Sequence, residues 1–255
     1  MSSDNQKFSR RDFLKTTGAA TGGIIGGSLL GGFVGFKMDS TDLPTEEANE
    51  TASETAEDMN MEARTFFSRS EDFRTLAAAV ERIYPEDDNG PGAVELGVPY
   101  FIDRQLNGQW GSNSDDYMQG PFNPAASETH GIQERMNRGE MFLAGVRRIQ
   151  EISMDEHDAE FTSLDGGQQD DILRSFEAGD VEIKGMRSES FFELLKETTI
   201  EGVYSDPVYG GNKDMMGWKM IEYPGPRMGW LSEVLTDEFM TLEPQNLRDY
   251  QGGGV

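Results

Sequence analysis

The sequence contains no cysteine, which excludes disulfides, iron–sulfur ligation, thiolate zinc sites and a cysteine nucleophile. Histidine is nearly as scarce, because only His130 and His157 occur among 255 residues. Neither follows a glutamate by three residues, as the paired motifs of helical di-iron proteins require. We expect His130 near a helix start, in contact with solvent, and His157 in an exposed acidic loop. A P-loop, a nucleophile elbow and a dinucleotide-binding glycine motif after a strand are also absent. We therefore expect no catalytic and no metal-ligating residue on this chain.

Positive charge is scarce as well. The chain has 22 Lys and Arg against 47 Asp and Glu, a net charge of −25. This balance argues against nucleic acid as a partner, because a phosphate backbone needs clustered basic residues. Beyond Lys37 only four lysines remain, and acid is spread along the chain, a composition that favours adaptation to very high salt. Calcium binding is the alternative, but the best loop has Pro85 and Leu96 where an EF-hand needs carboxylates.

The N-terminus carries a compact basic motif. Residues 9–15 read Ser-Arg-Arg-Asp-Phe-Leu-Lys, and an uncharged segment rich in Gly, Ala, Leu and Ile follows over residues 16–36. This order resembles the twin-arginine export signal, which implies transfer of a folded protein to the twin-arginine translocase. The residues that carry the resemblance are Ser9, Arg10, Arg11, Phe13, Leu14 and Lys15. A chance arginine pair before a membrane helix is the alternative interpretation.

Two outcomes are open for this signal. The uncharged segment is about 20 residues long, enough to span a bilayer, but its many glycines weaken a helix. No small-residue cleavage site follows it. We assign residues 1–37 to a twin-arginine signal peptide or an N-terminal anchor. The expected location is the outer face of the cytoplasmic membrane or the extracytoplasmic space, anchored if the signal is uncleaved.

An acidic segment separates the signal from the folded part. Nine acidic residues and no Lys or Arg lie between residues 38 and 62, among Thr, Ala, Ser and Asn. Such a segment cannot bury enough apolar surface to offset the entropy lost on ordering. We predict a disordered acidic linker over residues 38–65 and a single folded domain over residues 66–255.

Hydrophobic residues of the folded part recur at helical spacing, without sustained alternation. A helix is predicted from Ser70, which can cap it, to the residue before Pro85. Further helices are predicted near residues 99–106, 130–152, 164–177, 191–202 and 214–221. Segments rich in Gly, Asn, Ser and Pro predict long ordered loops between them. The predicted fold class is mainly α, with one irregular helical domain and few strands.

Three stretches of the folded part carry distinctive motifs. They are residues 82–93 with 97–106, beginning Arg-Ile-Tyr-Pro-Glu-Asp-Asp; residues 117–122, Tyr-Met-Gln-Gly-Pro-Phe; and residues 199–214, ending Tyr-Gly-Gly-Asn-Lys-Asp and continuing to residue 225. Together they resemble the subunit 3, or gamma, family of small subunits of membrane-bound gluconate 2-dehydrogenase. The similarity spans about residues 70 to 226, and a twin-arginine signal at the front is typical of the family. The acidic linker and surface depart from the family but leave the motifs intact.

The resemblance implies a non-catalytic subunit that carries no cofactor. It implies a large FAD-containing partner of the glucose-methanol-choline oxidoreductase type, which oxidises a sugar, sugar acid or alcohol. Electrons would then pass to a cytochrome c subunit or another membrane acceptor. The small subunit would support maturation of the flavoprotein and carry it through the twin-arginine pore. Two rival hypotheses are an enzyme that works alone and an envelope-anchored structural protein of a halophile without a redox partner.

A turn with two glycines and nearby aromatic residues indicates a candidate partner interface. Glycines serve where φ is positive or backbones approach closely, and aromatic and Met side chains beside them make good interface anchors. We hypothesise that the 84–93 loop and the 204–225 region dock on the flavoprotein; the alternative is that they form the domain's own core. The candidate residues are Tyr84, Pro85, Asp87, Asp88, Gly90, Pro91, Tyr209, Gly210, Gly211, Asn212, Trp218 and Tyr223.

Overall fold

The computed structural model describes residues 63–123, 125–126, 130–131, 133–229, 235 and 240–250. The export signal, and the predicted linker as far as residue 62, lie outside these residues. Within the described part the fold is mainly helical with one pair of short strands, as the sequence predicts. None of the helices described there is long and apolar enough to cross a membrane.

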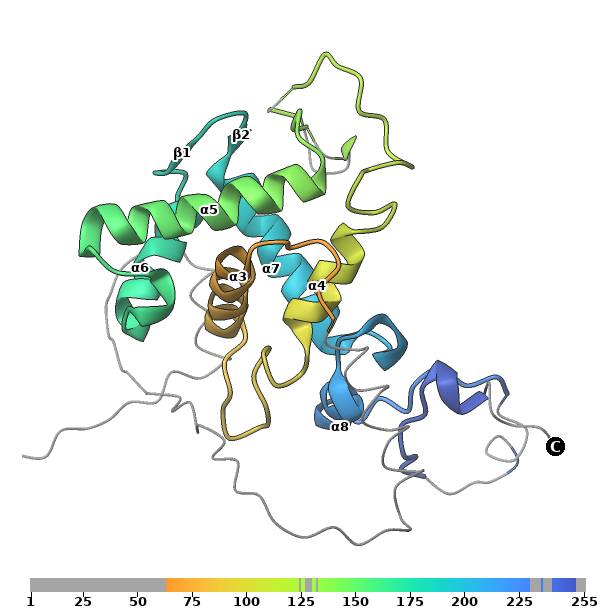
Figure 1. Ribbon diagram of the computed structural model, residues 1–255. Helices are drawn as coiled ribbons and strands as arrows, with labels where there is room; N and C mark the ends of the chain where they lie inside the picture. Colours follow the sequence, from red (N-terminus) through yellow and green to blue (C-terminus); the bar gives the residue numbers. More distant parts are fainter. Residues whose placement is uncertain are drawn as a thin grey trace, which may run out of the picture.

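The longer helices of the described part pack into one body (Figure 1). They are α3 Ser70–Ile83, α4 Val98–Leu106, α5 Arg138–His157, α6 Gly166–Glu177 and α7 Ser188–Tyr204. The short helix α8 covers Met216–Met220, and strands β1 Glu182–Ile183 and β2 Met186–Arg187 form an antiparallel pair. The connecting segments contain short 3-10 helices: η2 Phe161–Ser163, η3 Pro207–Tyr209, η4 Lys213–Met215 and η5 Leu247–Tyr250.

Helix α7 lies at the centre of the core, in contact with α3, α4, α5, α6 and α8. Its Phe191 ring is fully buried, with centroids 6.1 Å from Phe142 of α5 and 5.6 Å from Phe176 of α6. Edge-to-face aromatic pairs attract at these distances. A Cβ at Gly145 would lie 2.3 Å from the Phe191 ring. Gly145 therefore sets how closely α5 approaches α7.

Two buried carboxylates tie α3 to its neighbours. Asp72 accepts hydrogen bonds from Arg147 of α5 at 3.0 and 3.1 Å, and Asp170 of α6 accepts from Arg82 at 2.7 and 2.9 Å. In each pair the arginine replaces the hydrogen bonds to water that the carboxylate loses on burial. The pairs hold α3 between α5 and α6 and thereby position its C-terminal end, where the candidate site begins.

Helix α5 begins and ends later than the predicted range of residues 130–152. Asn137 caps it, since its side chain accepts from the N–H of Glu140 at 2.9 Å and the Glu140 carboxylate accepts from the N–H of Asn137 at 3.0 Å. This reciprocal capping box fixes the helix start at Arg138. At its C-terminal end the helix extends beyond the predicted last residue, 152, and ends at His157.

Three smaller predictions also need correction. Ser70 is the first residue of α3 rather than its cap, and the capping position, Arg69, makes no side-chain cap. His157 lies at the end of α5 and not in an exposed loop; it is half-buried, with Nδ1 3.3 Å from Nε2 of Gln168. His130 is exposed, as predicted, but among the described residues the α-helix that follows it begins only at Arg138.

Candidate functional site

A glutamate of α3 holds the loop between α3 and α4. The Glu81 carboxylate accepts hydrogen bonds from the backbone N–H groups of Glu86, at 3.3 Å, and Val94, at 2.9 Å. A Cβ at Gly92 would lie 2.0 Å from a Glu81 oxygen, so glycine leaves the room that the carboxylate needs. Burial raises the pKa of Glu81 above its ordinary value, and the two hydrogen bonds offset part of that rise. The carboxylate thus fixes both ends of the loop to α3.

Asn212 organises the turn that follows α7. Its side chain is fully buried; Nδ2 donates to the carbonyl oxygen of Ser205 at 2.8 Å, and Oδ1 accepts from the N–H of Gly217 at 2.7 Å. The residue has a φ of 49°, in the left-handed region where asparagine is better tolerated than most residues. Asn212 therefore joins the end of α7 to the start of α8.

Glycines bring the two segments together through their backbones. A Cβ at Gly97 would lie 2.9 Å from the carbonyl oxygen of Gly210, and the N–H of Lys213 donates to the carbonyl oxygen of Leu96 at 3.1 Å. In Figure 1 the α3–α4 loop and α8 lie at the same end of the molecule. We call this region, residues 84–97 and 204–225, the corner.

The aromatic residues predicted to form an interface divide between core and surface. The Trp218 side chain is 3% exposed, and its Nε1 donates to the carbonyl oxygen of Tyr204 at 2.8 Å. Tyr84 is also buried, with its hydroxyl 3.3 Å from that of Tyr204. Tyr223 packs edge-on against Trp218, with ring centroids 5.3 Å apart, but is 44% exposed, and Tyr209 is 50% exposed. Trp218 thus supports the corner from within, while both exposed tyrosines face solvent.

The other predicted interface residues divide in the same way. Buried are Pro85, Pro91, Gly210, Gly211 and Asn212, whereas Asp87, Asp88 and Gly90 are partly or fully exposed. Gly90 packs against α8, since a Cβ there would lie 2.6 Å from Sδ of Met220. Only the exposed members are accessible to another molecule, and the buried ones shape the corner.

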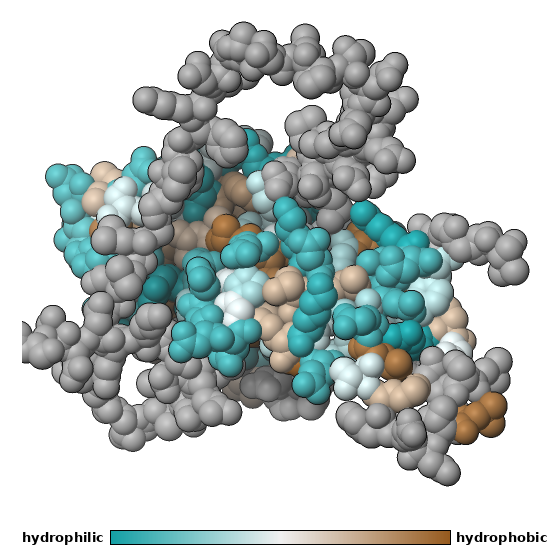
Figure 2. Space-filling model, turned by 90° about the horizontal axis from the view of Figure 1, so that it is seen from below, coloured by the Kyte–Doolittle hydropathy of each residue, from teal (hydrophilic) through white to brown (hydrophobic). Residues whose placement is uncertain are grey.

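Two exposed apolar residues of the corner were not predicted. Val94, on the α3–α4 loop, is 47% exposed, and Ile221, directly after α8, is 53% exposed. Figure 2 views the molecule from below, the side on which α8 lies in Figure 1, and shows apolar residues there between hydrophilic ones. No periodic pattern marks single apolar residues in loops, so sequence reasoning could not find them.

A small pocket of about 330 Å³ opens within the corner, and both segments contribute to its wall. It is lined by Pro91, Val94, Glu95, Leu96, Lys213, Asp214 and Met216. The remaining stretch of the resemblance, residues 117–122, lies in the loop between α4 and α5, away from the corner in Figure 1. Tyr117 of that stretch is 80% exposed.

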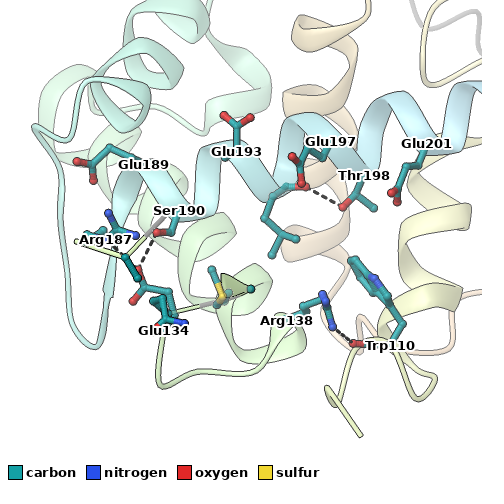
Figure 3. A pocket seen from close by; sticks show the side chains of 15 residues that line it. Trp110, Glu134, Arg138, Arg187, Glu189, Ser190, Glu193, Glu197, Thr198 and Glu201 are labelled. Atoms are coloured by element: carbon teal, nitrogen blue, oxygen red, sulfur yellow. Dashed lines mark hydrogen bonds and ion pairs between the residues drawn. The ribbon is translucent and has the colours of Figure 1, made fainter. Parts of the chain in front are cut away.

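A larger pocket of about 600 Å³ runs along α7 (Figure 3). One wall carries Glu189, Glu193, Glu197 and Glu201, whose spacing of four residues places them on one helix face. The facing wall includes Trp110 and Arg138; the guanidinium carbon lies 4.8 Å from the Trp110 ring centroid, and Nη1 donates to the Trp110 carbonyl oxygen at 3.1 Å. The spacing is visible in the sequence, but carboxylates are too common in this chain to single it out.

The electrostatics of this groove follow from the glutamate row. Burial raises the pKa of Glu201 above its ordinary value, repulsion by Glu197 raises it further, and Arg138 lowers it. The groove's largely buried Glu134 accepts from Arg187 at 3.0 Å and from Ser190 at 2.7 Å. The lining as a whole carries an excess of negative charge, because five glutamates stand against Arg138 and Arg187. Within the described residues, no group of three or more His, Asp or Glu side chains is placed to hold a metal ion.

The fold and the corner define a class of protein: a mainly helical domain whose most distinctive feature is a surface built by two glycine-rich segments, on a chain with an N-terminal export motif. Comparison with protein families identifies the family to which the chain belongs. Residues 70–225 match the model for gluconate 2-dehydrogenase subunit 3, and residues 7–24 match the twin-arginine translocation pathway signal sequence. The chain belongs to the gluconate 2-dehydrogenase subunit 3 family and carries a signal for twin-arginine export to the extracytoplasmic side, which confirms the resemblance. Neither a curated protein nor a solved structure matches the chain.

Proposed function

We propose that this chain is the non-catalytic small subunit of an exported FAD-dependent dehydrogenase complex. Its partner is a large flavoprotein of the glucose-methanol-choline type that oxidises a sugar, sugar acid or alcohol and passes electrons to a cytochrome c or another membrane acceptor. The small subunit supports maturation of the flavoprotein and carries it through the twin-arginine translocase. The observation that carries the proposal is the presence, on one chain, of a twin-arginine signal at residues 7–24 and a subunit 3 domain at residues 70–225.

If two chains are exported on one signal, the chain that bears the signal must bind the other chain stably. The signal-bearing chain must hold its partner throughout passage, so the two must bind before export. The twin-arginine route accepts folded proteins, so a flavoprotein with FAD already inserted can travel in this way. The predicted linker over residues 38–65 would leave the folded domain free to bind while the signal engages the translocase.

The corner supplies the binding surface in this proposal. Tyr209, Ile221 and Tyr223 expose apolar and aromatic surface of the kind enriched at protein interfaces. The buried Asn212 and Trp218 hold the same region through hydrogen bonds to backbone groups. A surface that is already ordered binds at a lower entropic cost than one that must fold on contact.

A second candidate function is an envelope-anchored structural protein of a halophile without a redox partner. The net charge of −25 favours this reading, because a strongly acidic surface suits a high-salt envelope. A pull-down with the native chain from a membrane fraction, kept in high salt, separates the two. Recovery of a second chain with flavin absorbance supports the dehydrogenase subunit, whereas recovery of the chain alone supports the structural protein.

The export role is tested by replacing Arg10 and Arg11 together by Lys. We expect the flavoprotein to accumulate in the cytoplasm, because its carrier no longer engages the translocase; immunoblots and dye-linked activity of the cell fractions measure this. The matched control replaces the exposed pair Arg69 and Arg74 by Lys and should leave export unchanged. Normal export of the flavoprotein beside a retained small subunit would contradict the proposal.

A further inference from the structure

We propose that the small pocket of the corner is a socket for one apolar side chain of the flavoprotein partner, flanked on the partner by a basic residue. The proposal rests on the function proposed above and narrows it from a surface to a defined contact. Three observations support it: the shape of the pocket, the backbone of its wall and the charges at its rim.

Four of the seven residues that line the pocket are apolar, and Val94 among them is accessible from solvent. Leu96 is 1% exposed, Pro91 is buried and Met216 is partly buried, while Val94 at the edge is 47% exposed. The volume of about 330 Å³ lies at the lower end of the range of roughly 300–1,000 Å³ typical of ligand pockets. This size suits a single large side chain rather than a dinucleotide cofactor.

One wall of the pocket is held in an uncommon backbone conformation. Asp214 and Met215 have φ values of 55° and 56°, in the left-handed region that is unfavourable for L-residues. Asn and Asp relieve such strain through local hydrogen bonds, but Met has no side-chain group for this. Backbone strain that the surrounding structure sustains is concentrated at functional sites. Here the strained backbone is held in place by the side-chain hydrogen bonds of Asn212 and by the bond from the N–H of Lys213 to the carbonyl oxygen of Leu96. The socket is therefore already formed before a partner binds.

The rim of the pocket is negative on balance. Glu95 and Asp214 each add an exposed carboxylate, against the one ammonium group of Lys213 among the lining residues. Charge complementarity across an interface favours a Lys or Arg opposite such a rim. Salt screens this contribution, so the apolar anchor carries more of the affinity as the salt concentration rises.

Filling the socket tests the proposal. Val94→Trp puts a large side chain at the pocket edge, and Met154→Trp is the control, since Met154 is 44% exposed on α5. Full-length variants are immobilised in high-salt buffer, and the dissociation constant of the purified flavoprotein is measured. We expect Val94→Trp to weaken binding by at least about tenfold, the loss typical of an interface hot spot, and Met154→Trp to bind like the wild type. Melting curves in the same buffer show whether both variants fold.

A second variant decides the matter if Val94→Trp does not fold. Glu95→Gln combined with Asp214→Asn keeps the shape of the socket, because asparagine tolerates the left-handed backbone. We expect weaker binding at moderate salt and a difference that shrinks as salt is added.

Each outcome has one meaning. Wild-type affinity of the folded Val94→Trp variant, or an equal loss in the Met154→Trp control, overturns the socket. If Val94→Trp does not fold, wild-type affinity of the charge variant at all salt concentrations overturns it. Failure of the wild-type chain itself to bind any flavoprotein overturns the proposed function, and not merely the socket.

Discussion

Asp103, fully buried on α4, fastens the start of the domain. Its carboxylate accepts hydrogen bonds from the N–H groups of Phe66, at 3.1 Å, and Phe67, at 2.8 Å, and from the N–H and hydroxyl of Thr65, at 2.5 and 2.9 Å. Residues 65–67, at the start of the domain, are therefore held against α4 by a single carboxylate. No sequence pattern predicts this contact, because the residues are 36 to 38 positions apart.

Asp103→Asn should destabilise the domain by about 2–3 kcal/mol, since an amide cannot replace a carboxylate that accepts from several buried donors. Its NH₂ group would face backbone N–H groups that then lack an acceptor. Denaturant unfolding in one high-salt buffer measures the change. Asp180→Asn, at an exposed position, is the control and should stay within about 0.5 kcal/mol. Equal stability of Asp103→Asn and the wild type would refute this role.

Glu201 gives a prediction about pH. Burial and Glu197 raise its pKa in the folded state above the ordinary value of 4.5, so its contribution to stability is present below that value and is lost as pH rises through the raised pKa. Glu201→Gln should therefore raise the melting temperature at pH 7 and flatten the fall in stability from about pH 4.5 upward. Thermal melts across this range, with Glu189→Gln at the other end of the row as control, measure it. A lower melting temperature at pH 7 would show that the Glu201 charge stabilises the fold.

At the scale of elements, four helices were predicted close to where they lie. Helices α3, α4, α6 and α7 carry regular apolar spacing with clear stop signals such as Pro85, and packing in the core preserves that pattern. The start of α5 was missed although Asn137 and Glu140 stand at capping-box spacing. The last predicted helix splits into η4 and α8 because Asp214 and Met215 adopt left-handed backbone, which depends on contacts that no local pattern encodes.

The contact between α8 and α7 depends on one glycine. A Cβ at Gly217 would lie 2.0 Å from the carbonyl oxygen of Val203, which is backbone and cannot move aside. Gly217→Ala should therefore displace α8, destabilise the domain by about 1–3 kcal/mol and weaken flavoprotein binding through the corner. Gly229→Ala, where a Cβ meets nothing within 4 Å, should change neither. Unfolding curves and the binding assay report both effects, and an unaltered Gly217→Ala protein would disprove the close packing.

At the scale of the whole molecule, the sequence predicted the family, the export signal and the helical class, because each rests on a motif or a period. It did not predict how the corner divides between core and surface. Asn212 and Trp218 look like interface residues in the sequence, yet they are buried by contacts with Ser205, Gly217 and Tyr204. Burial of this kind follows from tertiary packing, which a single sequence does not reveal.

The net charge of −25 leads to a prediction for the entire chain. In dilute buffer the carboxylates repel one another over long distances, and salt shortens that range to a few ångströms. We expect the melting temperature to rise steeply with added salt and the protein to loosen or unfold in dilute buffer. Calorimetry over a salt series measures this. A cooperative transition at high temperature without added salt would rule out adaptation to high salt.

The division of labour between this chain and a flavoprotein is tested most directly by the dye-linked dehydrogenase activity of the purified chain, measured in high salt with and without the large subunit. We predict no dye reduction and no flavin absorbance for the chain alone, and both for the pair. Substrate-dependent dye reduction by the isolated chain would contradict the account, because the redox chemistry would then reside on this polypeptide.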